Sequence, residues 1–212
     1  MNPIEIRSQQ QLDELKQKHG EAFFTMQKES IEAIVKLTDD QIDELFLLYQ
    51  RLLFIFTAEK SATIETPCDA LLLEFFINIE MAKFFDSPSK KYPTATLKNF
   101  VEIREVQDLL DNHSHNIKRL KDYRDKELAH HEMGATKKID PKPVIEYQEL
   151  LKEINDILFK VLYVYSKLNA QRLGNHNLFE ELLHRNELLR DYYSNKEMLG
   201  KKATIETEEV AK

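Results

Sequence analysis

Long apolar stretches with helical spacing are the feature of this sequence that most constrains its fold. Leu45, Leu48, Leu52 and Ile55 lie three and four positions apart, which places them on one face of an α-helix. All-β folds need turn residues at short intervals, whereas this chain of 212 residues has only 4 glycines and 6 prolines. The pattern therefore predicts an all-α protein, a bundle of four to five core helices with additional N- and C-terminal helices.

Capping residues and helix breakers divide the chain into successive elements. Thr38 and Gln41 have the spacing of a capping box, Thr66 followed by Pro67 marks a second helix start, and Gly20 interrupts an N-terminal helical segment. The expected helices span about residues 38–60, 66–85, 96–110, 116–132, 143–169 and 177–199. We accordingly expect an N-terminal helical extension (1–38), a bundle (39–170), a C-terminal helix (171–199) and a disordered tail (200–212).

Charge and apolar content limit the classes of partner. The formal net charge is -7, so binding of a nucleic acid would have to come from a local basic patch. The apolar stretches at 45–56 and 70–85 are interrupted by polar residues and are shorter than the ~20 residues of a membrane span. The N-terminus has no apolar signal-peptide core, and the single cysteine, Cys68, rules out an intrachain disulfide. We expect a cytoplasmic protein with no membrane partner.

The densest basic run of the chain is IKRLKDYRDK, residues 117–126. Acidic side chains alternate with the basic ones, so a solvated helix face with internal ion pairs is one reading and a nucleic-acid interface is the other. The tyrosine in this run could stack on a base or, more simply, fill a helix interface. The candidate RNA-binding residues are Lys118, Arg119, Lys121, Tyr123 and Lys126.

Four of the 7 histidines cluster near this run, namely His113, His115, His130 and His131. On a helix, neighbours diverge by about 100° and residues two apart by about 200°, so neither close pair presents two nitrogens to one metal ion. Solvated histidines are the better explanation. We expect no metal and no other cofactor.

Arginine and histidine on one element nevertheless suit RNA cleavage without a metal. Histidine can move a proton near neutral pH, and arginine can stabilise the extra negative charge on a phosphorane-like transition state. Arg124 and His130 lie six residues apart, which on a straight helix is about 9 Å along the axis and about 120° around it. His131 lies on the same face as Arg124, so it is the alternative catalytic residue. A two-fold dimer offers another solution, because arginine and histidine of different subunits can meet.

The segment Arg124–His130, RDKELAH, resembles the motif of the HEPN superfamily: arginine, a polar residue, a short spacer and histidine. The surrounding order of elements is similar to the abortive-infection branch of that superfamily, with a helix ending in FFDS at 84–87 and a long helix after the motif. The resemblance covers about residues 40–168.

The resemblance implies a homodimeric, metal-independent endoribonuclease that leaves a cyclic phosphate. Arg124 and His130 would be catalytic, and Asp125 would orient the arginine. Regulated members of the family often carry a tyrosine two residues after the histidine, whereas this chain has Glu132, which argues against control by modification of such a tyrosine.

We therefore expect an endoribonuclease of a prokaryotic defence or toxin type that acts on single-stranded RNA or exposed loops. An antitoxin or another defence-system protein would be a possible partner. The alternative is a non-catalytic helical dimerisation or interaction module that binds a protein or nucleic-acid partner, because some members of the superfamily keep the fold without cleaving RNA.

Overall fold

The computed structural model describes residues 5–88, 94–125 and 144–169. Within these ranges the chain forms eight α-helices and one short 3-10 helix, with no β-strand, which confirms the all-α prediction. The elements are α1 (Gln9–His19), α2 (Glu21–Thr25), α3 (Lys28–Val35), α4 (Asp39–Ser61), α5 (Pro67–Lys83), η1 (Leu97–Phe100), α6 (Arg104–Asn112), α7 (Ser114–Tyr123) and α8 (Val144–Leu168).

The two predicted helix starts are confirmed in atomic detail. The Thr38 hydroxyl accepts a hydrogen bond from the Gln41 amide at 3.3 Å, and the Gln41 side chain accepts one from the Thr38 amide at 3.0 Å. The same reciprocal pair joins Thr66 and Asp69 at the start of α5, with Pro67 at the first helical position. Each box satisfies amide groups that have no partner inside the helix, so both starts are determined locally.

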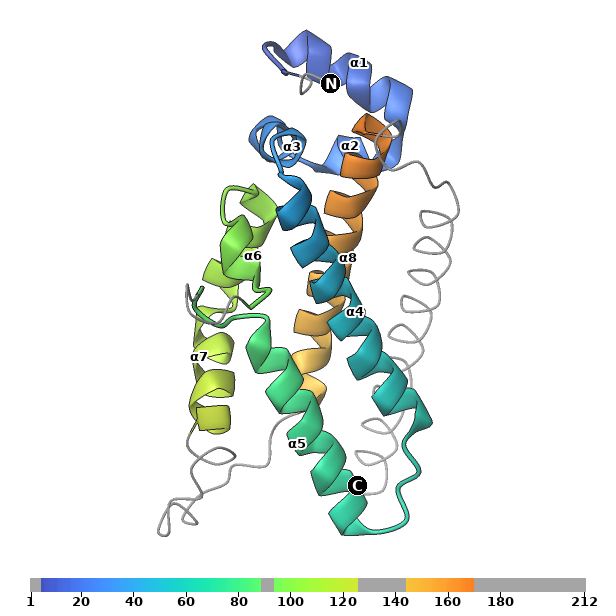
Figure 1. Cartoon of the computed structure of the whole chain (residues 1–212), viewed down its shortest axis with the longest axis vertical. Helices are drawn as coiled ribbons and strands as arrows, with labels where there is room; N and C mark the ends of the chain where they lie inside the picture. Colours follow the sequence, from blue (N-terminus) through green and yellow to red (C-terminus); the bar gives the residue numbers. More distant parts are fainter. Residues whose placement is uncertain (1–4, 89–93, 126–143, 170–212) are drawn as a thin grey trace, which may run out of the picture. The chain divides into compact units, whose positions relative to one another are not determined.

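Helices α4 and α8 run through the middle of the described bundle (Figure 1) and pack against each other. α5 lies beside both of them, and α7 packs on α5. The core between these helices is apolar, including Leu45, Leu52, Ile154 and Leu158, which are fully buried. Burial of such side chains is the main source of stability for a bundle, at about 1.5–3 kcal/mol each.

The N-terminal helices join this bundle. Gly20 has a φ of 97° and separates α1 from α2, as its position in the sequence predicts. α2 and α3 pack on α8, and the Tyr163 hydroxyl on α8 donates a hydrogen bond to the His19 carbonyl at 3.1 Å. The described part of this segment, residues 5–38, therefore packs on the bundle.

The expected single helix over 96–110 is wrong, because this segment forms the 3-10 helix η1 and then α6. The Thr96 hydroxyl is buried and donates to the carbonyls of Phe84, at 2.9 Å, and Asp86, at 2.8 Å. This anchor to the end of α5 orients η1, and the following α-helix begins only at Arg104. The polar segment after residue 110 is also more helical than predicted, since only His113 separates α6 from α7.

Two predicted parts lie outside the described residues, the C-terminal helix (171–199) and the tail (200–212). In the part that is described, no helix is both long enough and apolar enough to cross a membrane.

Candidate functional site

The end of α7 is held against α5, and this contact determines where Arg124 lies. Ile117 and Leu120 are the buried residues of α7, one turn apart on the face that packs inward. Tyr123 continues this face and packs against Phe75 of α5, with ring centroids 6.4 Å apart. Tyr123 therefore lies in a helix interface, and its stacking on a base stays a prediction.

Arg124 follows directly and keeps helical backbone angles, with φ -55° and ψ -48°. Its Nη1 donates a hydrogen bond to Asp86 Oδ1 at 2.6 Å, and its Nε donates to Asp125 Oδ1 at 2.8 Å. The Arg124 side chain is 21% exposed, Asp86 26% and Asp125 55%. The guanidinium group is thus partly buried and oriented by two carboxylates. Within the described residues, no acceptor is hydrogen-bonded to Nη2.

The two carboxylates favour the charged form of Arg124. Burial alone would lower the pKa of Arg124, but the hydrogen bonds and charges of Asp125 and Asp86 outweigh burial and raise it. A permanently charged, oriented guanidinium is suited to bind a phosphate oxygen.

Asp86 is the central acceptor of a cluster that the sequence does not reveal. Lys121, one turn before Arg124 on α7, places its Nζ 3.5 Å from the Phe85 carbonyl. Lys98 on η1 interacts electrostatically with both Asp86 and Lys121. We call Lys98, Lys121, Arg124 and Asp86 the α5-end cluster. Cations are favourable here because the C-terminal end of a helix carries partial negative charge.

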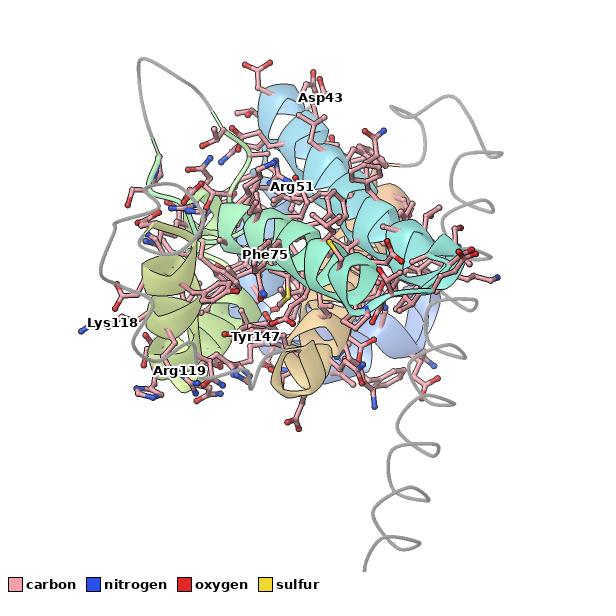
Figure 2. All side chains as sticks on the ribbon, turned by 90° about the horizontal axis from the view of Figure 1, so that it is seen from below. Asp43, Arg51, Phe75, Lys118, Arg119 and Tyr147 are labelled. Atoms are coloured by element: carbon pink, nitrogen blue, oxygen red, sulfur yellow. The ribbon has the colours of Figure 1, made fainter. Side chains whose placement is uncertain are left out.

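Arg51 of α4 supports this end of α5 from the other side. Its Nη1 donates to the Ala95 carbonyl at 3.1 Å, its Nε lies 3.6 Å from Glu80 Oε2, and its guanidinium stacks on the Phe84 ring at 5.7 Å. Burial lowers the pKa of Arg51, opposed by the charges of Glu80 and Asp86. Figure 2 shows Arg51 between α4 and α5. Through these contacts Arg51 stabilises the packing of α4 on the end of α5.

The remaining candidate residues divide into two groups. Lys118 is exposed and Arg119 is half-buried, and Figure 2 shows both on the outer side of α7. Lys126, His130 and the alternative catalytic residue His131 lie outside the described residues. The structure therefore brings Arg124 together with Asp125 and Lys121, and leaves the histidine half of the motif a prediction.

The expectation that the clustered histidines are solvated is wrong for His113. Its side chain is 16% exposed, and its Nε2 lies 3.0 Å from Oε2 of Glu153 on α8. This contact joins the α6–α7 corner to α8, so His113 has a structural partner. His115, by contrast, is exposed as predicted. Among the described side chains, no group of three or more His, Cys, Asp or Glu is arranged to hold a metal ion.

The sequence pattern does not mark Asp86 or Lys98 as site residues. Asp86 lies 38 positions before Arg124, and nothing in the spacing of the two residues links them. Lys98 stands alone between apolar and amide residues, in LKNF, so it belongs to no basic run. Only the packing of α5, η1 and α7 brings these side chains together.

Comparison of the chain with protein-family models, with curated proteins and with solved structures gives no match.

Proposed function

We propose that this protein is a metal-independent endoribonuclease of the HEPN type, belonging to a prokaryotic defence or toxin system. The observation that carries the proposal is the arginine of the RDKELAH segment, which is partly buried, doubly oriented by carboxylates and adjacent to Lys121. Oriented cations are what the transition state of phosphodiester cleavage requires, because negative charge accumulates on the non-bridging oxygens. We expect a cytoplasmic homodimer, with an antitoxin or other defence-system protein as a further partner.

The proposed reaction uses the 2′-hydroxyl of the RNA as its nucleophile. The 2′-oxygen forms a bond to phosphorus while the bond from phosphorus to the 5′-oxygen breaks, which leaves a 2′,3′-cyclic phosphate and a 5′-hydroxyl. His130 accepts the proton of the 2′-hydroxyl, and the imidazolium of the partner subunit's His130 gives a proton to the leaving 5′-oxygen. Arg124 binds a non-bridging oxygen, and Asp125 keeps the guanidinium oriented.

Cleavage of a single-stranded RNA by the purified protein in the presence of EDTA tests the proposal. We expect His130→Ala to lower the rate by roughly 10²–10⁴-fold and Arg124→Ala by roughly 10²–10³-fold, because each removes a group that acts in the transition state. RNA with 2′-O-methyl groups should not be cleaved, since its nucleophile is blocked.

Matched controls separate these effects from general damage. His115→Ala removes an exposed histidine, and Arg104→Ala removes an exposed arginine that is paired with Asp108 on α6. Both control variants should cleave at the wild-type rate. Equal rates for folded His130→Ala, folded Arg124→Ala and wild type would show that the catalytic assignment is wrong.

A second candidate function is a non-catalytic interaction module, favoured by exposed apolar side chains on the α4–α5 hairpin. Leu47 and Phe54 on α4 and Leu72 on α5 are 54%, 56% and 59% exposed. Exposed apolar groups on neighbouring elements are common at protein–protein interfaces. This function predicts a stable dimer by light scattering, weakened by Phe54→Ser, with no RNA cleavage by the wild-type protein.

A further inference from the structure

Lys98 is held beside the end of α5 by a rigid anchor. Two residues before it, the Thr96 hydroxyl donates to the carbonyls of Phe84 and Asp86 at 2.9 and 2.8 Å. The Leu97 amide donates to the Phe84 carbonyl at 2.8 Å. Because Thr96 and Leu97 are buried, the start of η1 cannot move away from α5 without breaking these bonds. The backbone at Lys98 is therefore held beside the end of α5.

The positive charge of Lys98 is poorly compensated where it lies. Burial and the neighbouring charge of Lys121 lower the pKa of Lys98, and Asp86 only partly opposes them. Asp86 is also the acceptor for Arg124 and interacts electrostatically with Arg51, so one carboxylate faces Lys98, Arg124 and Arg51. Among the described residues, none forms an ion pair or a side-chain hydrogen bond with the Lys98 ammonium group. An additional anion at this position would relieve the repulsion between Lys98 and Lys121.

The arrangement of the cations suits an extended polyanion. Lys121 and Arg124 lie three residues apart at the end of α7, about 4.5 Å along the axis and about 60° around it, and Lys98 joins them from η1. The donors thus come from two separate elements. A single-stranded nucleic acid presents its phosphates in a row, and flexible lysine side chains bind them as point charges.

We propose that Lys98 and Lys121 form a subsite for the backbone phosphate next to the one that Arg124 binds in single-stranded RNA. The identity of the polyanion as RNA rests on the proposed function. The subsite itself rests on the position of Lys98, which does not belong to the sequence motif. Lys98 binds and positions the RNA, whereas Arg124 and His130 act on its reacting atoms.

Binding of a short, fully 2′-O-methylated RNA to the full-length protein tests the subsite without any cleavage step. By fluorescence anisotropy, Lys98→Met should bind about three- to tenfold more weakly than wild type, as expected for one lost charged contact of a partly exposed lysine. The slope of log K against log salt should become shallower by roughly 0.7, the value for one phosphate on a single strand. Lys98→Arg should keep most of the affinity.

The matched control is Lys36→Met, which removes an exposed lysine at the end of α3. It should bind with the wild-type affinity and salt slope. On a cleavable RNA, Lys98→Met should raise KM and leave kcat within about twofold, because the lost contact acts equally in the ground and transition states.

The outcomes distinguish this inference from the proposed function. If Lys98→Met and Lys36→Met bind alike, or if the wild type does not bind the oligonucleotide, the subsite is refuted even when cleavage is observed. If binding depends on Lys98 but no RNA is cleaved, the subsite stands and the proposed catalysis fails.

Discussion

Arg124 shows how a single side chain can serve both structure and a candidate reaction. Asp125, its neighbour in the chain, is more than half exposed and satisfies Nε, whereas Asp86 is partly buried and satisfies Nη1. The two carboxylates are therefore unequal. Asp125 is a local partner available to any helix with this sequence, while Asp86 is supplied by the end of α5 and also faces Lys98.

Neutralising Asp86 should cost more stability than neutralising Asp125. Asp86→Asn should lower the free energy of unfolding by about 1–2 kcal/mol, because it leaves three cations without their shared carboxylate. Asp125→Asn should cost less than about 1 kcal/mol, since Asp125 lies in a more exposed position where solvent screens its charge. Urea denaturation followed by circular dichroism measures both. Equal losses for the two variants would contradict the central place of Asp86.

At the scale of elements, local signals determine where helices begin, and tertiary contacts determine how the connecting segments run. The starts of α4 and α5 follow from capping boxes, and α8 spans Val144–Leu168, close to its predicted range of 143–169. The η1–α6 segment departs from prediction because the Thr96 hydroxyl forms hydrogen bonds with carbonyls at the end of α5. The periodic spacing of apolar residues gives no information about such a contact.

Gly20 provides a test of a backbone conformation that joins two elements. Its φ of 97° and ψ of -169° lie in a region that is open to glycine and costly for other residues. Gly20→Ala should lower the free energy of unfolding by about 1–3 kcal/mol for this backbone reason. Space is not the limit, because an added Cβ would lie 3.5 Å from the Tyr163 hydroxyl, an ordinary contact. Gln17→Ala, at an exposed position of α1, should change stability little in the same measurement.

At the scale of the described unit, the N-terminal helices are attached through the end of α8. His19 stacks on Phe23 with ring centroids 5.5 Å apart, and its carbonyl accepts the Tyr163 hydrogen bond. Burial, and then the charges of Lys18 and Lys167, lower the pKa of His19. The neutral imidazole is therefore the form that fits the folded protein.

This pKa predicts a loss of stability on acidification. The unfolded chain takes up a proton on His19 near its ordinary pKa of about 6.5, whereas the folded protein takes it up only at lower pH. As pH falls from 7.5 towards 5, the wild type should lose more unfolding free energy than His19→Gln, and the two should run in parallel above pH 7.5. Urea denaturation across this range measures the difference. A steeper loss for His19→Gln would contradict the direction of the pKa shift.

The sequence by itself determined the all-α class, the helix starts with their capping residues, the break at Gly20 and the arginine at the centre of the candidate site. These features depend on contacts between residues a few positions apart, which are present in the chain order. Only the tertiary structure decided the partners of that arginine. Asp86 and Lys98 reach Arg124 from α5 and η1, because buried apolar faces and the Thr96 anchor bring distant segments together. The electrostatic environment of a side chain depends on its distances in space to other charges, and these distances cannot be read from spacing along the chain.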